Sequence, residues 1–167
     1  MHDPLVYDFG IPGYRPHWVY DPDETTATHG RRLAALAGHM LCQTWLVWDL
    51  EHDEWYNDWP VLLDFDNERV EINHKKDEMS LTWNSVDPAQ PIDLDLECEW
   101  RPDPLPQLAS LRGHRLHAVE LLEPGIESGG RPIGLAFTFA AGRNHLQRRL
   151  ENGFAFDPPG PGRRHRD

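Results

Sequence analysis

One short phrase occurs twice in the chain, and this repeat constrains the fold more than any other feature. Residues 33–41 read LAALAGHML and residues 108–116 read LASLRGHRL. The two Gly-His pairs lie 75 positions apart, and similar segments follow them in the same order. Self-similarity of this kind indicates a unit that was duplicated and then diverged. Because each unit alone would bury little apolar surface, we expect the two copies to pack against each other as one domain.

The sequence of each copy predicts a short helix followed by an antiparallel β-meander. Strong helix formers precede each Gly-His pair, and glycine typically ends a helix, which predicts helices at 29–37 and 105–111. Alternating apolar residues predict strands at 41–48, 60–66, 69–74, 79–84 and 92–100, and again at 116–122, 132–139, 143–149 and 154–156. The predicted fold class is therefore mainly β, of the α+β type, with two tandem pseudo-symmetric repeats.

The same patterns divide the chain into four segments. Residues 1–29 are rich in proline and aromatic residues, which predicts an irregular arm lying over apolar surface of the body. The first repeat spans 30–103 and the second spans 104–157. Residues 158–167 are rich in Pro, Gly and Arg, and we expect this tail to be disordered.

Negative charge is concentrated in the first repeat. The net charge of the chain is −12, and residues 48–103 carry 17 Asp and Glu against 4 Lys and Arg. Residues 104–167 carry 6 against 9. A field of this sign repels nucleic acid and anionic membranes and attracts basic partners. We therefore expect a basic protein as the partner, and neither nucleic acid nor a membrane.

The chain has no motif that indicates catalysis. It lacks a phosphate-binding glycine loop, a G-x-S-x-G elbow and an H-E-x-x-H helix. Cys42 and Cys98 are isolated within apolar segments, so we expect two buried, unpaired thiols. His39 and His114 follow the predicted helix ends, where we expect them to bond helix carbonyl groups. The sequence thus predicts a protein that is not an enzyme, with no catalytic residue, no metal site and no cofactor.

Location is predicted from what the sequence lacks. The N-terminus has no basic start followed by an apolar stretch, so no signal peptide is expected. No apolar run approaches the ~20 residues that a membrane helix needs. We expect a cytoplasmic protein.

The first candidate site is the loop at 48–59, which alternates carboxylates with large aromatic residues. The matching segment of the second copy, 123–130, is small and rich in glycine. Aromatic residues beside charges are typical of an interface anchor with a charged rim. The alternative is that the aromatic side chains fold back onto the core and the acids are solvated. The partner-binding candidates here are Asp49, Glu51, Asp53, Glu54, Trp55, Tyr56, Asp58 and Trp59.

The second candidate site is a row of acids on the strand predicted at 92–100. Its members are Asp93, Asp95, Glu97 and Glu99, which alternate with apolar residues. Alternate residues of a strand share a face, so the four carboxylates form a line. This line either keeps an exposed strand from pairing with other molecules or docks the Lys and Arg residues of a partner.

Several segments together resemble a known group of proteins. They are G-H-x-L, an apolar strand ending in Trp48-Asp49, the hairpin strand EINH at 71–74, and SLTWNSVDP at 80–88. This pattern, over 30–157, resembles small two-repeat proteins of high-GC Gram-positive, actinobacterial type that are associated with toxin immunity and bacterial defence. The resemblance carries no catalytic motif and implies a binding protein.

These observations lead to one functional hypothesis and one alternative. The hypothesis is a non-catalytic, immunity-type protein that neutralises or docks onto a basic partner, such as a toxin, through the acidic first repeat. The alternative is a small-ligand or carbohydrate binder that uses the Trp-rich loop as a stacking platform.

Overall fold

Two antiparallel sheets and two helices make up the computed structural model, which describes residues 9–75, 78–92, 97–121, 134–139, 145–149 and 154–155. The helices are α1 (Pro22–Ala34) and α2 (Pro106–Ala109). The strands are β1 (Trp18–Val19), β2 (Leu41–Asp49), β3 (Glu54–Trp55), β4 (Val61–Phe65), β5 (Arg69–Lys75), β6 (Glu78–Trp83), β7 (Cys98–Pro102), β8 (Leu116–Leu121), β9 (Gly134–Phe139), β10 (His145–Arg149) and β11 (Phe154–Ala155). The prediction of a mainly β, antiparallel protein is confirmed.

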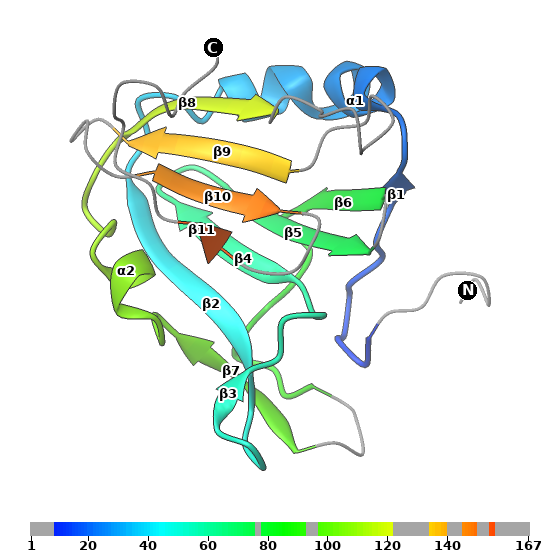
Figure 1. Ribbon diagram of the computed structural model, residues 1–167, viewed down its shortest axis with the longest axis vertical. Coiled ribbons are helices and arrows are strands. Elements are labelled where there is room, and N and C mark those ends of the chain that lie inside the picture. Colours follow the sequence, from blue (N-terminus) through cyan, green and yellow to red (C-terminus); the bar gives the residue numbers. More distant parts are fainter. Residues whose placement is uncertain are drawn as a thin grey trace.

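Strands β2, β4, β5 and β6 pair in sequence as the predicted first meander, and β8 to β11 pair in sequence as the second, whereas β7 pairs with β2 rather than with β6. The first sheet has the order β1-β6-β5-β4-β2-β3, and β7 also pairs with β2. The second sheet has the order β11-β10-β9-β8. Figure 1 shows the second sheet in front of the first, with α1 alongside β8 at one end of the long axis and β3 and β7 at the other end.

The first sheet separates two apolar clusters because neighbouring residues of a strand point to opposite faces. In β4, Val61 and Leu63 belong to one cluster and Leu62 belongs to the other. The cluster that contains Val61 and Leu63 also contains Phe137 and Phe139 of β9, so it lies between the two sheets, and we call it the inner core. The outer core lies on the opposite face of the first sheet, and its buried members are Ile11, Tyr14, Val47, Trp59, Leu62, Val86 and Trp100.

The N-terminal arm is more regular than predicted. It covers apolar surface as expected, since Ile11 and Tyr14 are each 1% exposed, but it also adds β1 to the first sheet. The prediction of irregular structure up to residue 29 is wrong, because α1 begins at Pro22. The Asp21 side chain caps the helix by accepting from the Asp23 N–H at 3.0 Å. Proline is favourable at the first helical position, where its missing N–H and fixed φ cost nothing.

The two Gly-His segments lie side by side and exchange backbone hydrogen bonds. Met40 and Arg115 form an antiparallel bridge. Both glycines have a left-handed backbone, with φ of 88° at Gly38 and 85° at Gly113, which a side chain would oppose. The exchanged N–H to O contacts are Gly38 to Leu116 (2.8 Å), Gly113 to Leu41 (2.8 Å), Leu41 to His114 (3.0 Å) and Leu116 to His39 (2.8 Å).

Two predictions about side chains are wrong. The imidazole of His39 does not bond a helix carbonyl group; its Nδ1 lies 2.7 Å from Asp66 Oδ1, because the turn after β4 reaches the Gly-His segment. Cys42 is exposed rather than buried, because it points away from the core-facing side of β2. Cys98 is half-buried, and both thiols are free.

No helix among the described residues is long and apolar enough to cross a membrane.

Candidate functional site

The two acidic segments predicted from the sequence lie together at the end of β2. Trp48 and Asp49 of β2 face Trp55 and Glu54 of β3 on one side. The same two residues face Glu99 and Cys98 of β7 on the other side. Beyond the strand, the Leu50 N–H donates to the Glu97 carbonyl oxygen at 3.0 Å. The hairpin loop and the start of β7 therefore form one structure, at the lower end of Figure 1.

The carboxylates around this end are exposed. We call this surface the acidic tip and define it by Glu51, Asp53, Glu54, Glu97 and Glu99, all of which are exposed. Asp58 is also exposed and lies in the turn that follows β3. Asp93 and Asp95, the other half of the predicted acidic row, lie outside the described residues.

Asp49 shapes the loop rather than facing a partner. Its Oδ1 accepts from the backbone N–H groups of Glu51 at 3.0 Å and His52 at 3.2 Å. Its Oδ2 lies 2.8 Å from His52 Nδ1, and the carboxylate side chain is only 17% exposed. These contacts lower the pKa of Asp49, and the Asp49 carboxylate in turn raises the pKa of His52. Asp49 thus forms a side-chain-to-backbone turn, which fixes where the neighbouring acids point.

A basic residue that the sequence reasoning missed lies at the edge of the acidic tip. The Arg101 guanidinium stacks over the Trp48 ring, 5.0 Å from its centroid, and lies 2.8 Å from Glu99 Oε2. It also reaches Asp53 at 3.8 Å, and the Trp48 indole N–H donates to the same Asp53 oxygen at 2.9 Å. The signal was present in the sequence, because Arg101 follows Glu97 and Glu99 at the two-residue spacing of one strand face.

Most of the aromatic surface of the loop is used internally. Trp59 is 9% exposed and belongs to the outer core, where its indole N–H donates to the Phe9 carbonyl oxygen at 3.0 Å. Tyr56 packs on Trp59, with ring centroids 4.3 Å apart. Trp55 and Tyr56 are half-buried. The structure therefore assigns Trp59 to the core instead of a contact surface, because its ring joins the loop to the arm.

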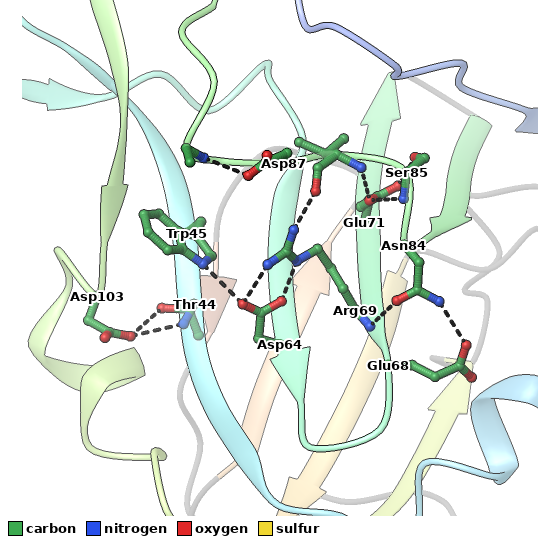
Figure 2. A network of polar contacts seen from close by, with 12 residues as sticks. Thr44, Trp45, Asp64, Glu68, Arg69, Glu71, Asn84, Ser85, Asp87 and Asp103 are labelled. Carbon is green, nitrogen blue, oxygen red and sulfur yellow. Dashed lines mark hydrogen bonds and ion pairs between the residues drawn. The ribbon is translucent and has the colours of Figure 1, made fainter.

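A separate polar network lies on the first sheet, away from the tip (Figure 2). Asp64 binds the Arg69 guanidinium and accepts the Trp45 indole N–H at 3.1 Å. Arg69 also donates to the Val86 carbonyl oxygen. Asp103 accepts from the Thr44 N–H at 2.9 Å. These contacts tie the 84–87 segment and the end of β7 to the first sheet.

Glu71 is the most buried carboxylate of this network, with 0% exposure. It accepts from the hydroxyl groups of Thr82 and Ser85 and from the backbone N–H groups of Ser85 at 2.8 Å and Val86 at 2.7 Å. A buried carboxylate with several donors is stabilised without a cation. Its role is to hold the chain that leaves β6.

Two features of the described residues bear on metal and ligand binding. The described residues contain no group of three His, Cys, Asp or Glu side chains that could hold a metal ion. An apolar groove of about 200 Å³ lies between α1 and the second sheet, lined by Thr25, Thr26, Gly30, Leu33, Ala34, Val119, Leu121 and Leu135. The elements α1 and β8, which line this groove, lie at the opposite end of Figure 1 from β3.

Comparisons with known proteins found no match: no family model, no curated protein and no solved structure is similar to the chain. The resemblance to immunity-associated proteins stays a prediction.

Proposed function

We propose that this protein is a non-catalytic binding protein that docks onto a basic protein partner through the acidic tip. The observation that carries the proposal is the pairing of β2 with both β3 and β7 at one end, which gathers exposed carboxylates from two distant segments. We further propose an immunity-type role, in which the partner is a toxin that is neutralised in the cytoplasm.

The charge balance of the tip supports a basic partner. Its five carboxylates are exposed, and the basic groups that the structure places against the end of β2 are Arg101 and His52. The surplus negative charge lies where β2 pairs with both β3 and β7. Such a surface steers a positive partner and raises its association rate.

The proposed contacts are assigned by what each acid already binds. Asp53 and Glu99 contact Arg101, so we assign the main ion pairs with the partner to the exposed Glu51, Glu54 and Glu97. Trp48 and Arg101 present a stacked pair at the rim, where partner side chains can pack. We retain Trp55 and Tyr56 as half-buried contributors and leave Trp59 to the core.

We also infer that the scaffold behind the tip descends from a duplicated unit. The reciprocal hydrogen bonds between the two Gly-His segments support this inference, as do the matched left-handed glycines. In this view the two copies supply a common framework, and the acidic tip is an addition to the first copy.

The proposal is tested with two matched triple variants of the full-length protein. The tip variant is Glu51→Gln, Glu54→Gln and Glu97→Gln. The control variant is Asp23→Asn, Glu24→Gln and Glu120→Gln, which removes the same charge from exposed positions on α1 and β8. The immobilised protein captures partners from a lysate of the native host, and the affinity of the purified partner is then measured for all three forms.

We expect a basic partner whose affinity falls about tenfold for the tip variant, since each lost rim ion pair contributes roughly 0.2–1 kcal/mol. The control variant should stay within about twofold of the wild type. Equal affinity of the tip variant and the wild type would overturn the proposal, and so would an equal loss in both variants, because that would indicate a non-specific effect of net charge.

A further inference from the structure

The imidazole of His29 is buried beneath α1 in a site that suits its neutral form. His29 is 7% exposed, and its Nδ1 accepts the Trp83 indole N–H at 3.2 Å. An indole N–H can only donate, so Nδ1 must carry a lone pair and the ring proton must lie on Nε2. Nε2 is buried without a hydrogen-bond partner among the residues that the structure describes.

The charged groups around this imidazole are basic. His17, next to β1, has its ring centroid 6.5 Å from that of His29. Arg32, one turn along α1, stacks its guanidinium 4.7 Å from the centroid of the same Trp83 ring. The nearby carboxylate is Glu68, in the turn between β4 and β5, and Arg32 occupies it with contacts of 2.5 and 3.0 Å. Burial lowers the pKa of His29, and His17 and Arg32 lower it further.

The other strand that packs on α1 contributes apolar groups. Val119 and Leu121 of β8 line the groove beneath the helix, opposite Leu33. Glu120 and His117 of β8 are exposed. The packing of α1 on β8 therefore offers no carboxylate to compensate a positive imidazole.

We propose that His29 is a proton-sensitive latch that holds α1 down while its imidazole is neutral and releases the helix when it is protonated. A proton on Nδ1 makes the ring a donor that faces the donor N–H of Trp83, so the hydrogen bond is lost. The same proton creates a buried cation beside two basic groups. Release of α1 uncovers the apolar groove on β8 and β9.

The direction of the pH dependence follows from the pKa. A released His29 titrates near 6.5, and the latched His29 titrates lower. The latch is therefore at full strength above pH 6.5 and weakens as the pH falls below that value. The weakening levels off below the pKa of the latched form.

The test compares the full-length wild type with His29→Gln, whose amide oxygen still accepts from Trp83 but does not titrate. Amide hydrogen exchange is followed in α1 and, as an internal reference, in β4 and β5 at about pH 7.5 and about pH 5.5, after correction for intrinsic rates. In the wild type we expect α1 to open more at the lower pH, by up to about tenfold, because pH 5.5 lies one unit below the pKa of the released form. In His29→Gln the opening of α1 should be equal at the two pH values.

Two further measurements keep the test decisive. His17→Gln is the matched control, because it removes an exposed basic neighbour but keeps the latch, and its α1 should still open at low pH. An NMR titration of His29 in the wild type should give a pKa below 6.5. A pKa at or above 6.5, or the same pH-dependent opening of α1 in His29→Gln as in the wild type, would overturn the latch.

Discussion

The two ends of the molecule carry the same pair of side chains in different surroundings. Under α1, Arg32 stacks on Trp83 at 4.7 Å and binds Glu68. At the acidic tip, Arg101 stacks on Trp48 at 5.0 Å and binds Glu99. The main difference is where the indole N–H points.

That difference decides what each pair does. The Trp83 indole N–H points inward to the buried His29, so the pair joins α1 to the first sheet. The Trp48 indole N–H points to Asp53, whose side chain is 86% exposed, so the pair organises a surface. The same stacked contact stabilises a core in one place and arranges exposed charges in the other.

The largest expected contrast is between the two tryptophans. Trp83→Ala removes packing against the inner core and the hydrogen bond that the Trp83 indole N–H donates to His29, and it should cost about 3 kcal/mol of unfolding free energy. Trp48→Ala removes a rim contact and should cost about 1 kcal/mol. Urea unfolding of both variants measures the difference, and equal losses would show that the two pairs have the same role.

The next contrast is in binding. When the salt concentration rises from about 0.05 to about 0.5 M, the association rate of the purified partner should fall at least about tenfold, because screening shortens the reach of the tip charges. The unfolding free energy, which depends on the inner core, should change far less. Stopped-flow association and urea unfolding at the two salt concentrations measure these changes. An association rate that does not depend on salt would show that the charges of the acidic tip do not attract the partner.

The coupling free energies of the two Arg-Glu ion pairs should differ by less. A double-mutant cycle on Arg32 and Glu68 should give about 1 kcal/mol, because the contact is bidentate and Glu68 is only 18% exposed. The same cycle on Arg101 and Glu99, where Glu99 is 48% exposed, should give about 0.3 kcal/mol. Arg32 lowers the pKa of Glu68, so the first coupling should be full above pH 4.5 and disappear as the pH falls through the lowered pKa. A larger coupling at the tip would reverse the comparison.

The smallest effect concerns His29 under α1 and His52 at the acidic tip, whose pKa values shift in opposite directions. His52 lies beside carboxylates and its pKa is raised, mainly by Asp49, so its stabilising contribution is present below pH 6.5 and lost as the pH rises through the folded-state pKa. In Asp49→Asn, an NMR titration should show the pKa of His52 moving back towards 6.5. Glu54→Gln is the control, because Glu54 acts on the pKa of His52 more weakly than Asp49 or Glu51 and its loss should leave that pKa nearly unchanged. An unchanged His52 pKa in Asp49→Asn would contradict the contact between Asp49 and His52.

Strand positions were predictable because the alternation of apolar and polar residues is visible within a few neighbouring residues. The segment predicted at 69–74 is β5, and the segment predicted at 79–84 is β6 with a shift of one residue. The start of α1 was not predicted, since four prolines of the arm suggested irregular structure and the cap at Asp21 favours a helix over Pro22. Part of the predicted second repeat, including 123–130, and the whole of the separate tail at 158–167 lie outside the described residues.

The candidate site was predicted as two separate pieces. Their residues were found because carboxylates in alternation leave a clear pattern, but nothing local shows that Leu50 bonds Glu97. The exposure of the aromatic residues was also undecided, because Trp59 and Trp55 look alike in sequence and differ only in what they pack against.

By itself, the sequence determined that the chain forms antiparallel strands and carries its negative charge in residues 48–103, since periodicity and composition are properties of neighbouring residues. Only the tertiary structure decided which acids meet at the tip, which tryptophan enters the core and which histidine is buried. Those outcomes depend on contacts between segments far apart in the chain, such as β2 with β7 and α1 with β6. Such contacts are selected by the packing of the whole fold rather than by any local pattern.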